Sequence, residues 1–222
     1  MTEVALFTSC LVDTFFPDVT AATVRLLERL GVYVTIPAGQ TCCGQPPYNA
    51  GFWPEARPIA RHFLDVFADA PAIVTPTGSC ATMVRAEFAH LFADEPELLA
   101  QATAVAAKTY ELSEYLVDVL GVVDVGAEWH GRATWHDACH LSRALGIKQQ
   151  PRQLLANVKG LELVEMREAN CAVAEPWCCG FGGAFAVKQP AISNAMLNEK
   201  IRRIQATEVP TLISSDAGCI LH

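Results

Sequence analysis

Basic residues are scarce in this sequence. It has 16 Lys and Arg against 24 Asp and Glu, and a formal net charge of −8. Proteins that bind nucleic acid neutralise its phosphates with clustered Lys and Arg, and the sequence contains no such cluster. We therefore expect no nucleic-acid partner.

A hydrophobic run long enough to cross a membrane is also missing. The longest uncharged stretch, 31–54, is interrupted by Pro, Gly, Gln and Asn, whereas a spanning helix needs about 20 consecutive apolar residues. The first residues include Glu3 and Asp13 and no basic leader, so we expect no signal peptide. These absences predict a cytoplasmic protein without a membrane span.

Two short motifs of cofactor and metal sites are absent as well. No G-x-G-x-x-G opens a helix after the first expected strand, so we expect no nicotinamide or flavin site. No C-x-x-C, the usual spacing of structural zinc sites, occurs either. The sequence nevertheless has nine cysteines. Because disulfides are disfavoured in a reducing cytoplasm, these cysteines indicate metal binding or redox chemistry.

Eight of the nine cysteines form two copies of one pattern, C-x31-CC-x36-C followed by C-x38-CC-x39-C. Apolar stretches of strand character precede the cysteines, and amphipathic helical stretches separate them. We predict an α/β fold of two duplicated Rossmann-like β-α-β halves with mostly parallel sheets, related by a pseudo-two-fold.

The expected elements follow the same order in both halves. The first half covers 1–92 and the second half covers 132–222. A helical connection at 93–131 lies between them, with two helices expected over 97–120. The three parts could also pack as one compact unit. Strands are expected at 4–9, 32–36, 72–75, 132–139, 161–165 and 211–219, and helices at 19–30, 54–67, 152–158 and 191–206.

The repeated cysteines all follow expected strands, and parallel sheets bind ligands beyond the carboxyl ends of their strands. Four thiols should therefore converge in each half. The first set is Cys10, Cys42, Cys43 and Cys80, and the second is Cys139, Cys178, Cys179 and Cys219. The ninth, Cys171, has no counterpart and is interpreted as an ordinary small apolar residue.

Four cysteine thiolates hold iron–sulfur clusters, and zinc accepts the same donors. We favour a cluster because glycines at 44, 180, 182 and 183 follow the CC pairs and let the backbone approach sulfur closely. Zinc remains an alternative. A metal-free dithiol enzyme with a vicinal disulfide at 42–43 or 178–179 is another, but it leaves the other four cysteines of the pattern unexplained.

Three histidines lie near the second cysteine set. His136 and His140 flank Cys139, where they could ligate, donate to cluster sulfurs or move protons. They could equally order the loop through Asp137. His222, three residues after Cys219, is a weaker candidate for an extra ligand. His62 and His90 are expected on helices, as surface or core residues.

The two sites are expected to be unequal. The second CC pair is followed by three glycines, whereas Pro46 and Pro47 follow the first and remove two N–H donors. The first set also has no histidine near it. We therefore expect the second site to hold a cluster more firmly, and the first to be the one found empty or filled with zinc.

Six stretches resemble one known family: TCCGQPPYNAG, TPTGSCATMV, KTYELSEYLVDVLGV, WHDACHLSRALG, CCGFGGAFAVK and SDAGCILH. The chain is similar over nearly its whole length to the cysteine-rich CCG-domain iron–sulfur oxidoreductases, and within them to the lactate-utilisation members. It is more distantly similar to the cysteine-rich component of heterodisulfide reductase and to the iron–sulfur subunits of glycolate oxidase and anaerobic glycerol-3-phosphate dehydrogenase.

This resemblance implies an iron–sulfur electron-transfer subunit, with [4Fe–4S] chemistry, of an oxidoreductase complex that converts L-lactate to pyruvate. It implies as partners a ferredoxin-like iron–sulfur protein and a third subunit, and as ligands the two cysteine sets given above. The alternatives are a zinc-stabilised scaffold subunit, or the iron–sulfur subunit of a related glycolate, glycerol-3-phosphate or heterodisulfide oxidoreductase.

The sequence departs from the family pattern at two positions. Motifs of the heterodisulfide-reductase type close with C-x-x-C and supply a fifth thiolate to a fused cluster, but Met83 and His222 stand there in this chain. An ordinary four-iron cluster, or zinc in one half, therefore stays open. Relatives also usually continue beyond the last cysteine, whereas this sequence stops at His222.

Overall fold

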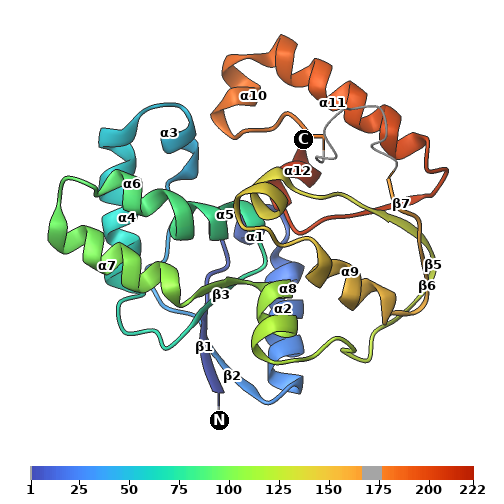
Figure 1. The fold of residues 1–222 in the computed structure, drawn as a ribbon, viewed down its shortest axis with the longest axis horizontal. Coiled ribbons are helices and arrows are strands. Elements are labelled where there is room, and N and C mark those ends of the chain that lie inside the picture. The colour runs from blue at the N-terminus through green and yellow to red at the C-terminus, as the bar shows by residue number, and fades with distance from the viewer. Residues whose placement is uncertain (1, 167–176) are drawn as a thin grey trace. The chain divides into compact units, whose positions relative to one another are not determined.

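The computed structural model describes residues 2–166 and 177–222, so Cys171 lies outside the described residues. The chain forms two compact units, divided between Leu112 and Ser113. Each unit contains one parallel β-sheet accompanied by helices (Figure 1). Within the described ranges, no helix has the length and apolar character that crossing a membrane requires.

The first unit has a four-stranded sheet in the order β2-β1-β3-β4. Its strands are β1 (Thr2–Leu6), β2 (Val32–Thr35), β3 (Ile73–Thr75) and β4 (Thr109–Glu111). All neighbouring strands are parallel. From β1 the chain first adds β2 on one side of the sheet and then returns to add β3 on the other side. The strand order therefore reverses at the carboxyl end of β1, and parallel sheets of this kind bind ligands at that point.

Helices pack on both faces of this sheet. In Figure 1, α4, α6 and α7 lie together on one side and α2 lies on the other. Phe7, which follows β1, packs its ring against Phe63 of α4 and Phe67 at the end of that helix, with centroid separations of 4.9 and 5.7 Å. The helical elements are α1 (Cys10–Phe15), α2 (Pro17–Arg29), α3 (Gln45–Asn49), α4 (Trp53–Val66), α5 (Gly78–Thr82), the π-helical turn η1 (Met83–Glu87), α6 (Phe88–Leu91) and α7 (Pro96–Ala107).

The second unit has a three-stranded parallel sheet in the order β6-β5-β7. Its strands are β5 (Glu128–Trp135), β6 (Lys159–Leu163) and β7 (Thr211–Ile213). Trp135, Leu141 and Ile147 form its small apolar core.

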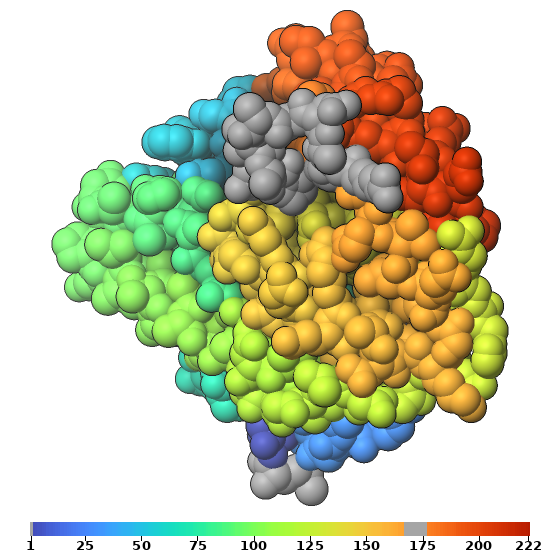
Figure 2. Space-filling model, turned by 45° about the vertical axis from the view of Figure 1, so that its right-hand side comes forward, coloured from blue at the N-terminus to red at the C-terminus, as the bar shows by residue number. Residues whose placement is uncertain are grey.

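Helices of this unit surround the sheet and include one long surface helix. They are α8 (Leu112–Glu114, at the division), the π-helical turns η2 (Tyr115–Val119) and η3 (His140–Ala144), α9 (Gln149–Ala156), α10 (Ala184–Lys188), α11 (Pro190–Gln205) and α12 (Ala217–Leu221). Figure 2 shows α11 at the surface, in orange to red, where it exposes Ile192 and Ile201.

The order β6-β5-β7 repeats β2-β1-β3. The residue after each central strand makes the same backbone contact: Phe7 N–H donates to the carbonyl of Val74 in β3, and His136 N–H donates to the carbonyl of Ile213 in β7, both at 2.8 Å. The predicted duplicated α/β fold with parallel sheets is thus confirmed. Phe7 and His136 occupy equivalent positions. The pseudo-two-fold between the halves stays a prediction.

Several details differ from the sequence-based expectation. The strand expected at 211–219 ends at Ile213 because Asp216 caps α12, and the strand expected at 132–139 spans Glu128–Trp135.

The first strand was expected to run to residue 9 but ends at Leu6, because Ser9 adopts a left-handed φ of 65° that breaks the extended chain. The stretch 97–120, expected as two helices, includes β4 between α7 and α8. Its buried residues Thr109 and Glu111 are polar, so the strand has no apolar pattern. The connection expected at 93–131 is therefore shared between the units.

Candidate metal centre

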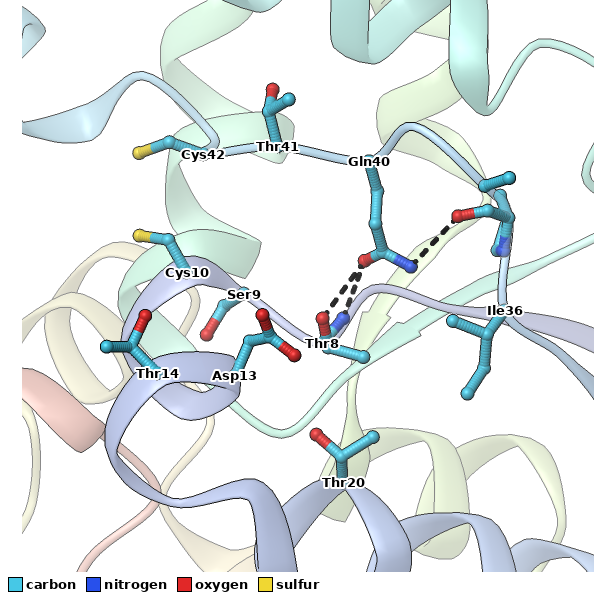
Figure 3. Close-up of a pocket in the computed structure, with 12 residues that line it drawn as sticks. Thr8, Ser9, Cys10, Asp13, Thr14, Thr20, Ile36, Gln40, Thr41 and Cys42 are labelled. Atoms are coloured by element: carbon cyan, nitrogen blue, oxygen red, sulfur yellow. Dashed lines mark hydrogen bonds between the residues drawn. The ribbon is translucent and has the colours of Figure 1, made fainter.

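The first cysteine set gathers at the carboxyl ends of β1, β2 and β3. Cys10 begins α1 after β1, Cys42 and Cys43 lie in the loop after β2, and Cys80 lies in α5 after β3. The adjacent thiols face different partners. The Cys43 and Cys80 sulfurs are 3.5 Å apart, whereas Cys42 is hydrogen-bonded to Cys10, whose sulfur faces it in Figure 3.

The second cysteine set repeats this arrangement. Cys139 follows β5, Cys178 and Cys179 precede α10, and Cys219 lies in α12 after β7. The sulfurs of Cys139 and Cys178 are 3.8 Å apart, and those of Cys179 and Cys219 are 3.3 Å apart. All eight cysteines are free thiols. Each sulfur of a CC pair contacts a distant cysteine of its set as well as its neighbour, so four thiols converge, which favours metal binding over a vicinal disulfide that would use only two of them.

One thiol in each set, Cys42 or Cys178, has a pKa below the ordinary cysteine value. The Cys10 thiol, the Cys43 thiol and the Gly44 N–H all donate to Cys42, and these hydrogen bonds lower the pKa of Cys42 to about 3. The pKa of Cys10 is raised, chiefly by this hydrogen bond and then by burial. Hydrogen bonding in the first site therefore favours the thiolate form of Cys42, which is the form of cysteine that binds metal.

The second site has similar electrostatics, with a backbone donor to each thiol of its CC pair. Hydrogen bonds from Cys139, Cys179 and the Gly180 N–H lower the pKa of Cys178 to about 2. Gly180 N–H lies 3.4 Å from the Cys178 sulfur, and Phe181 N–H lies 3.5 Å from the Cys179 sulfur. Backbone N–H groups aimed at sulfur stabilise both a thiolate and a bound cluster.

Gly180 is required at its position for two reasons. Its φ of +95° lies in the left-handed region, and an added Cβ would approach the backbone oxygen of Ser193 to 2.7 Å. Ser193, fully buried on α11, donates its hydroxyl to the Gly180 carbonyl at 2.9 Å. The loop that carries Cys178 and Cys179 is therefore packed tightly onto α11.

His136 is buried beside the second set, with 2% of its surface exposed. Neither ring nitrogen has a hydrogen-bond partner within the described residues. One ring nitrogen and the sulfurs of Cys179 and Cys219 all lie within 4.8 Å of one another. Burial lowers the pKa of His136 to about 4, so the ring is neutral and can offer a lone pair.

The other candidate histidines are placed differently. His140 brings Nδ1 to 3.9 Å from the Cys139 sulfur. His222 directs Nε2 to the Ser193 hydroxyl at 3.0 Å. His62 Nε2 contacts the Gly39 carbonyl at 2.7 Å, and His90 contacts Glu87, so both have local partners on the surface.

Asp137, between His136 and Cys139, orders the loop that leads to the cysteine. Arg152 donates from two guanidinium nitrogens to the two Asp137 oxygens at 2.9 and 2.7 Å. Trp135 Nε1 donates to the same carboxylate at 2.8 Å. Because a bidentate pair fixes direction as well as distance, it determines how the chain leaves β5.

A pocket of about 390 Å³ opens beside the first set, with Cys10 and Cys42 at one side (Figure 3). None of the described residues that line it is a Lys or Arg, and it contains the Asp13 carboxylate. Gln40 closes one wall, accepting from Thr8 N–H at 2.9 Å. Sequence reasoning missed this pocket, because its hydroxyl groups come from separate segments. The lining is Thr8, Ser9, Cys10, Asp13, Thr14, Thr20, Ile36, Pro37, Ala38, Gln40, Thr41 and Cys42.

The donor sets fit a thiolate-bound metal. Two thiolates on one tetrahedral metal, each at about 2.3 Å, lie about 3.8 Å apart. The sulfur pairs at 3.3 to 3.8 Å are close to that spacing, and each vicinal pair links two such sulfur pairs. Met83, where related motifs place a fifth thiol, is buried in the apolar core of the first unit.

Comparison with known proteins agrees with this geometry. Residues 4–85 and 133–222 match the family described as the CCG cysteine-rich domain. The chain is 51% identical over 220 residues to Lactate utilization protein A of Geobacillus kaustophilus, and the aligned region covers 99% of this chain and 89% of that protein. It is 46% identical to Lactate utilization protein A of Bacillus subtilis, with 99% and 90% covered. The two matched ranges contain all eight paired cysteines, and the chain belongs to the CCG cysteine-rich domain family.

Proposed function

We propose that this chain is the iron–sulfur electron-transfer subunit of a complex that oxidises L-lactate to pyruvate. The observation that carries the proposal is the convergence of eight thiols in two sets. The name shared by relatives of about half identity, Lactate utilization protein A, supports lactate as the substrate of the system.

Electron transfer suits the donor sets better than substrate chemistry on this chain does. Oxidation of L-lactate to pyruvate releases two electrons and two protons, and a bound cluster supplies one-electron redox chemistry that accepts them singly. The thiols of each set would hold the cluster, and the N–H groups of Gly44 and Gly180, which point at the Cys42 and Cys178 sulfurs, would stabilise its negative charge.

The pocket beside the first set argues that lactate is oxidised on another subunit. A carboxylate substrate is normally held by Arg or Lys, and the described lining residues contain neither. The Asp13 carboxylate would instead repel lactate. A ferredoxin-like iron–sulfur protein and a third subunit are the partners we propose for the complex.

The test is metal and sulfide analysis of anaerobically purified protein, followed by reduction. We expect iron and acid-labile sulfide in comparable amounts, broad visible absorption, and bleaching of that absorption when L-lactate and the partner subunits are added together. Protein that contains iron and sulfide but is never reduced by L-lactate with its partners would overturn the proposed role.

A zinc-stabilised scaffold is the second candidate, favoured by the sulfur spacing. Pairs at 3.3 to 3.8 Å match two thiolates on a single zinc ion. A scaffold would be colourless, would contain zinc without sulfide, and would hold the partner subunits together without changing oxidation state. The same analysis therefore decides between the two candidates.

A further inference from the structure

The two units differ at one position that faces the thiols. Phe7 and His136 follow the central strands of their sheets and donate the same backbone hydrogen bond to the neighbouring strand. Phe7 is fully buried and packs on the rings of α4. The position can therefore be filled by an aromatic ring that makes no polar contact at all.

His136 does not use its ring in that way. Its two nitrogens are buried without a hydrogen-bond partner in the described parts of the chain. A buried polar group without a partner loses its hydrogen bonds to water and gains none in return, and native structures contain few such groups. A histidine where phenylalanine suffices in the other unit indicates a partner that the polypeptide does not supply.

The location of the ring identifies that partner as a metal. One ring nitrogen lies within 4.8 Å of the sulfurs of both Cys179 and Cys219, which are themselves 3.3 Å apart. A nitrogen and a sulfur bound to the same tetrahedral metal lie about 3.6 Å apart, given bond lengths of about 2.0–2.1 and 2.3 Å. The observed separations, at most 4.8 Å, exceed this spacing by no more than about 1.2 Å. Imidazole is also a common ligand of iron and zinc.

We propose that His136 is a direct nitrogen ligand of the metal atom that Cys179 and Cys219 hold, which makes the second site a mixed nitrogen–sulfur site and leaves the first all-thiolate. This inference rests on the proposed function only in requiring that the second site binds metal. The other nearby histidines do not share the position, because His222 Nε2 contacts Ser193 and His140 lies beside Cys139.

A mixed site has a consequence for electron flow. A nitrogen ligand in one site only makes the electronic surroundings of the two metals unequal, and ligand type is one of the factors that set a reduction potential. The two sites should therefore differ in reduction potential although their cysteine patterns are equivalent.

The experiment uses full-length protein labelled with ¹⁵N-histidine and prepared anaerobically in a Cys42→Ala background, which removes the first site. Pulsed electron paramagnetic resonance of the paramagnetic cluster should show the strong nitrogen coupling of a bound imidazole. His136→Phe, which installs the residue of the first unit, should abolish this coupling and shift the midpoint potential. His62→Phe, at a surface histidine that contacts the Gly39 carbonyl, is the control and should keep both. If the metal is zinc, X-ray absorption at the zinc edge reports the same nitrogen ligand.

The outcomes separate the two proposals. A weak coupling typical of a hydrogen bond, or a strong coupling that survives in His136→Phe, overturns ligation by His136 while iron and sulfide still support the cluster. A zinc site with one nitrogen ligand that is lost in His136→Phe supports His136 and overturns the electron-transfer function. Where His136→Phe fails to fold, the absence of a strong coupling in the labelled protein with His136 intact still overturns ligation by His136.

Discussion

The sulfur atoms of Cys43 and Cys80 lie 3.5 Å apart although the residues are 37 positions apart in the chain. The neighbouring Cys42 faces Cys10 instead. One CC pair thus joins the loops that follow three parallel strands, and the equivalent pair in the second unit does the same. Each donor set is assembled by the strands of one sheet. Loss of one thiol should therefore weaken metal binding in its own site and leave the other site intact.

Removal of one thiol should therefore empty one site. We expect Cys80→Ala to lose about half of the bound metal, because two sites of four thiolates contribute comparably. Metal analysis of anaerobically prepared protein measures the loss. Cys171→Ser is the matched control, since that cysteine has no place in the repeated pattern, and it should retain all the metal. Full metal content in Cys80→Ala would rule out the first donor set.

The second site should hold its metal more firmly than the first. It has a backbone donor to each thiol of its CC pair, from Gly180 and Phe181. After brief exposure to air, Cys42→Ala should therefore keep most of the iron of the unexposed variant, whereas Cys178→Ala should lose most of its iron. Iron and sulfide content before and after exposure measure the difference. The opposite order would reverse the ranking of the sites.

Gly180→Ala should destabilise the second unit by more than its backbone conformation alone explains. A residue with Cβ in the left-handed region costs about 1–2 kcal/mol, and here the Cβ would also clash with the Ser193 backbone. Gly146→Ala has the same sign of φ with nothing within 4 Å and is the matched control. Chemical denaturation of metal-free protein should give a clearly larger loss of unfolding free energy for Gly180→Ala. Equal losses of unfolding free energy in the two variants would show that Gly180 is not required by close packing against Ser193.

The guanidinium of Arg152 should not be replaceable by an amine. Arg152 and Asp137 have only 23% and 16% of their side chains exposed, and lysine cannot form the bidentate pair. We expect Arg152→Lys to lower the free energy of unfolding by about 1–2 kcal/mol. Arg202→Lys, at an ion pair whose arginine side chain is 70% exposed, should change the free energy of unfolding far less, because solvent screens exposed ion pairs. Similar losses in both variants would contradict a positioning role for Arg152.

Tyr48, on the helix after the first CC pair, should lose its proton only at unusually high pH. Burial, and then the hydrogen bond that its hydroxyl donates to Glu87, raise its pKa to about 12. Because the folded state retains the proton, the associated stability is present below pH about 10, the ordinary tyrosine value, and is lost as the pH rises from there toward 12. Tyrosinate absorbance measured against pH should lose its last step in Tyr48→Phe. Glu87→Gln should move that step to lower pH, and an unchanged titration in both variants would contradict the assignment.

Much of the fold could be predicted because its repeat is local in the sequence. Apolar stretches followed by cysteines indicated parallel strands with thiols at their carboxyl ends, and the sheets β2-β1-β3 and β6-β5-β7 have that form. The strand β4 was missed because Thr109 and Glu111 are buried polar residues, and burial of such residues is decided by tertiary contacts. The end of β1 was misplaced because the turn at Ser9 requires a left-handed φ that favours other residue types.

By itself, the sequence determined that eight cysteines belong to two equivalent sets, because their spacing repeats in register with the strands. Only the tertiary structure decided which sulfur faces which, since adjacent residues of a CC pair direct their side chains to different neighbours. It also decided that His136, and not His222, brings a free ring nitrogen to the second set, because the β5–β7 contact places the ring beside Cys179 and Cys219 while Ser193 holds the other imidazole. Spacing along a chain fixes how many donors are available, and packing fixes their direction.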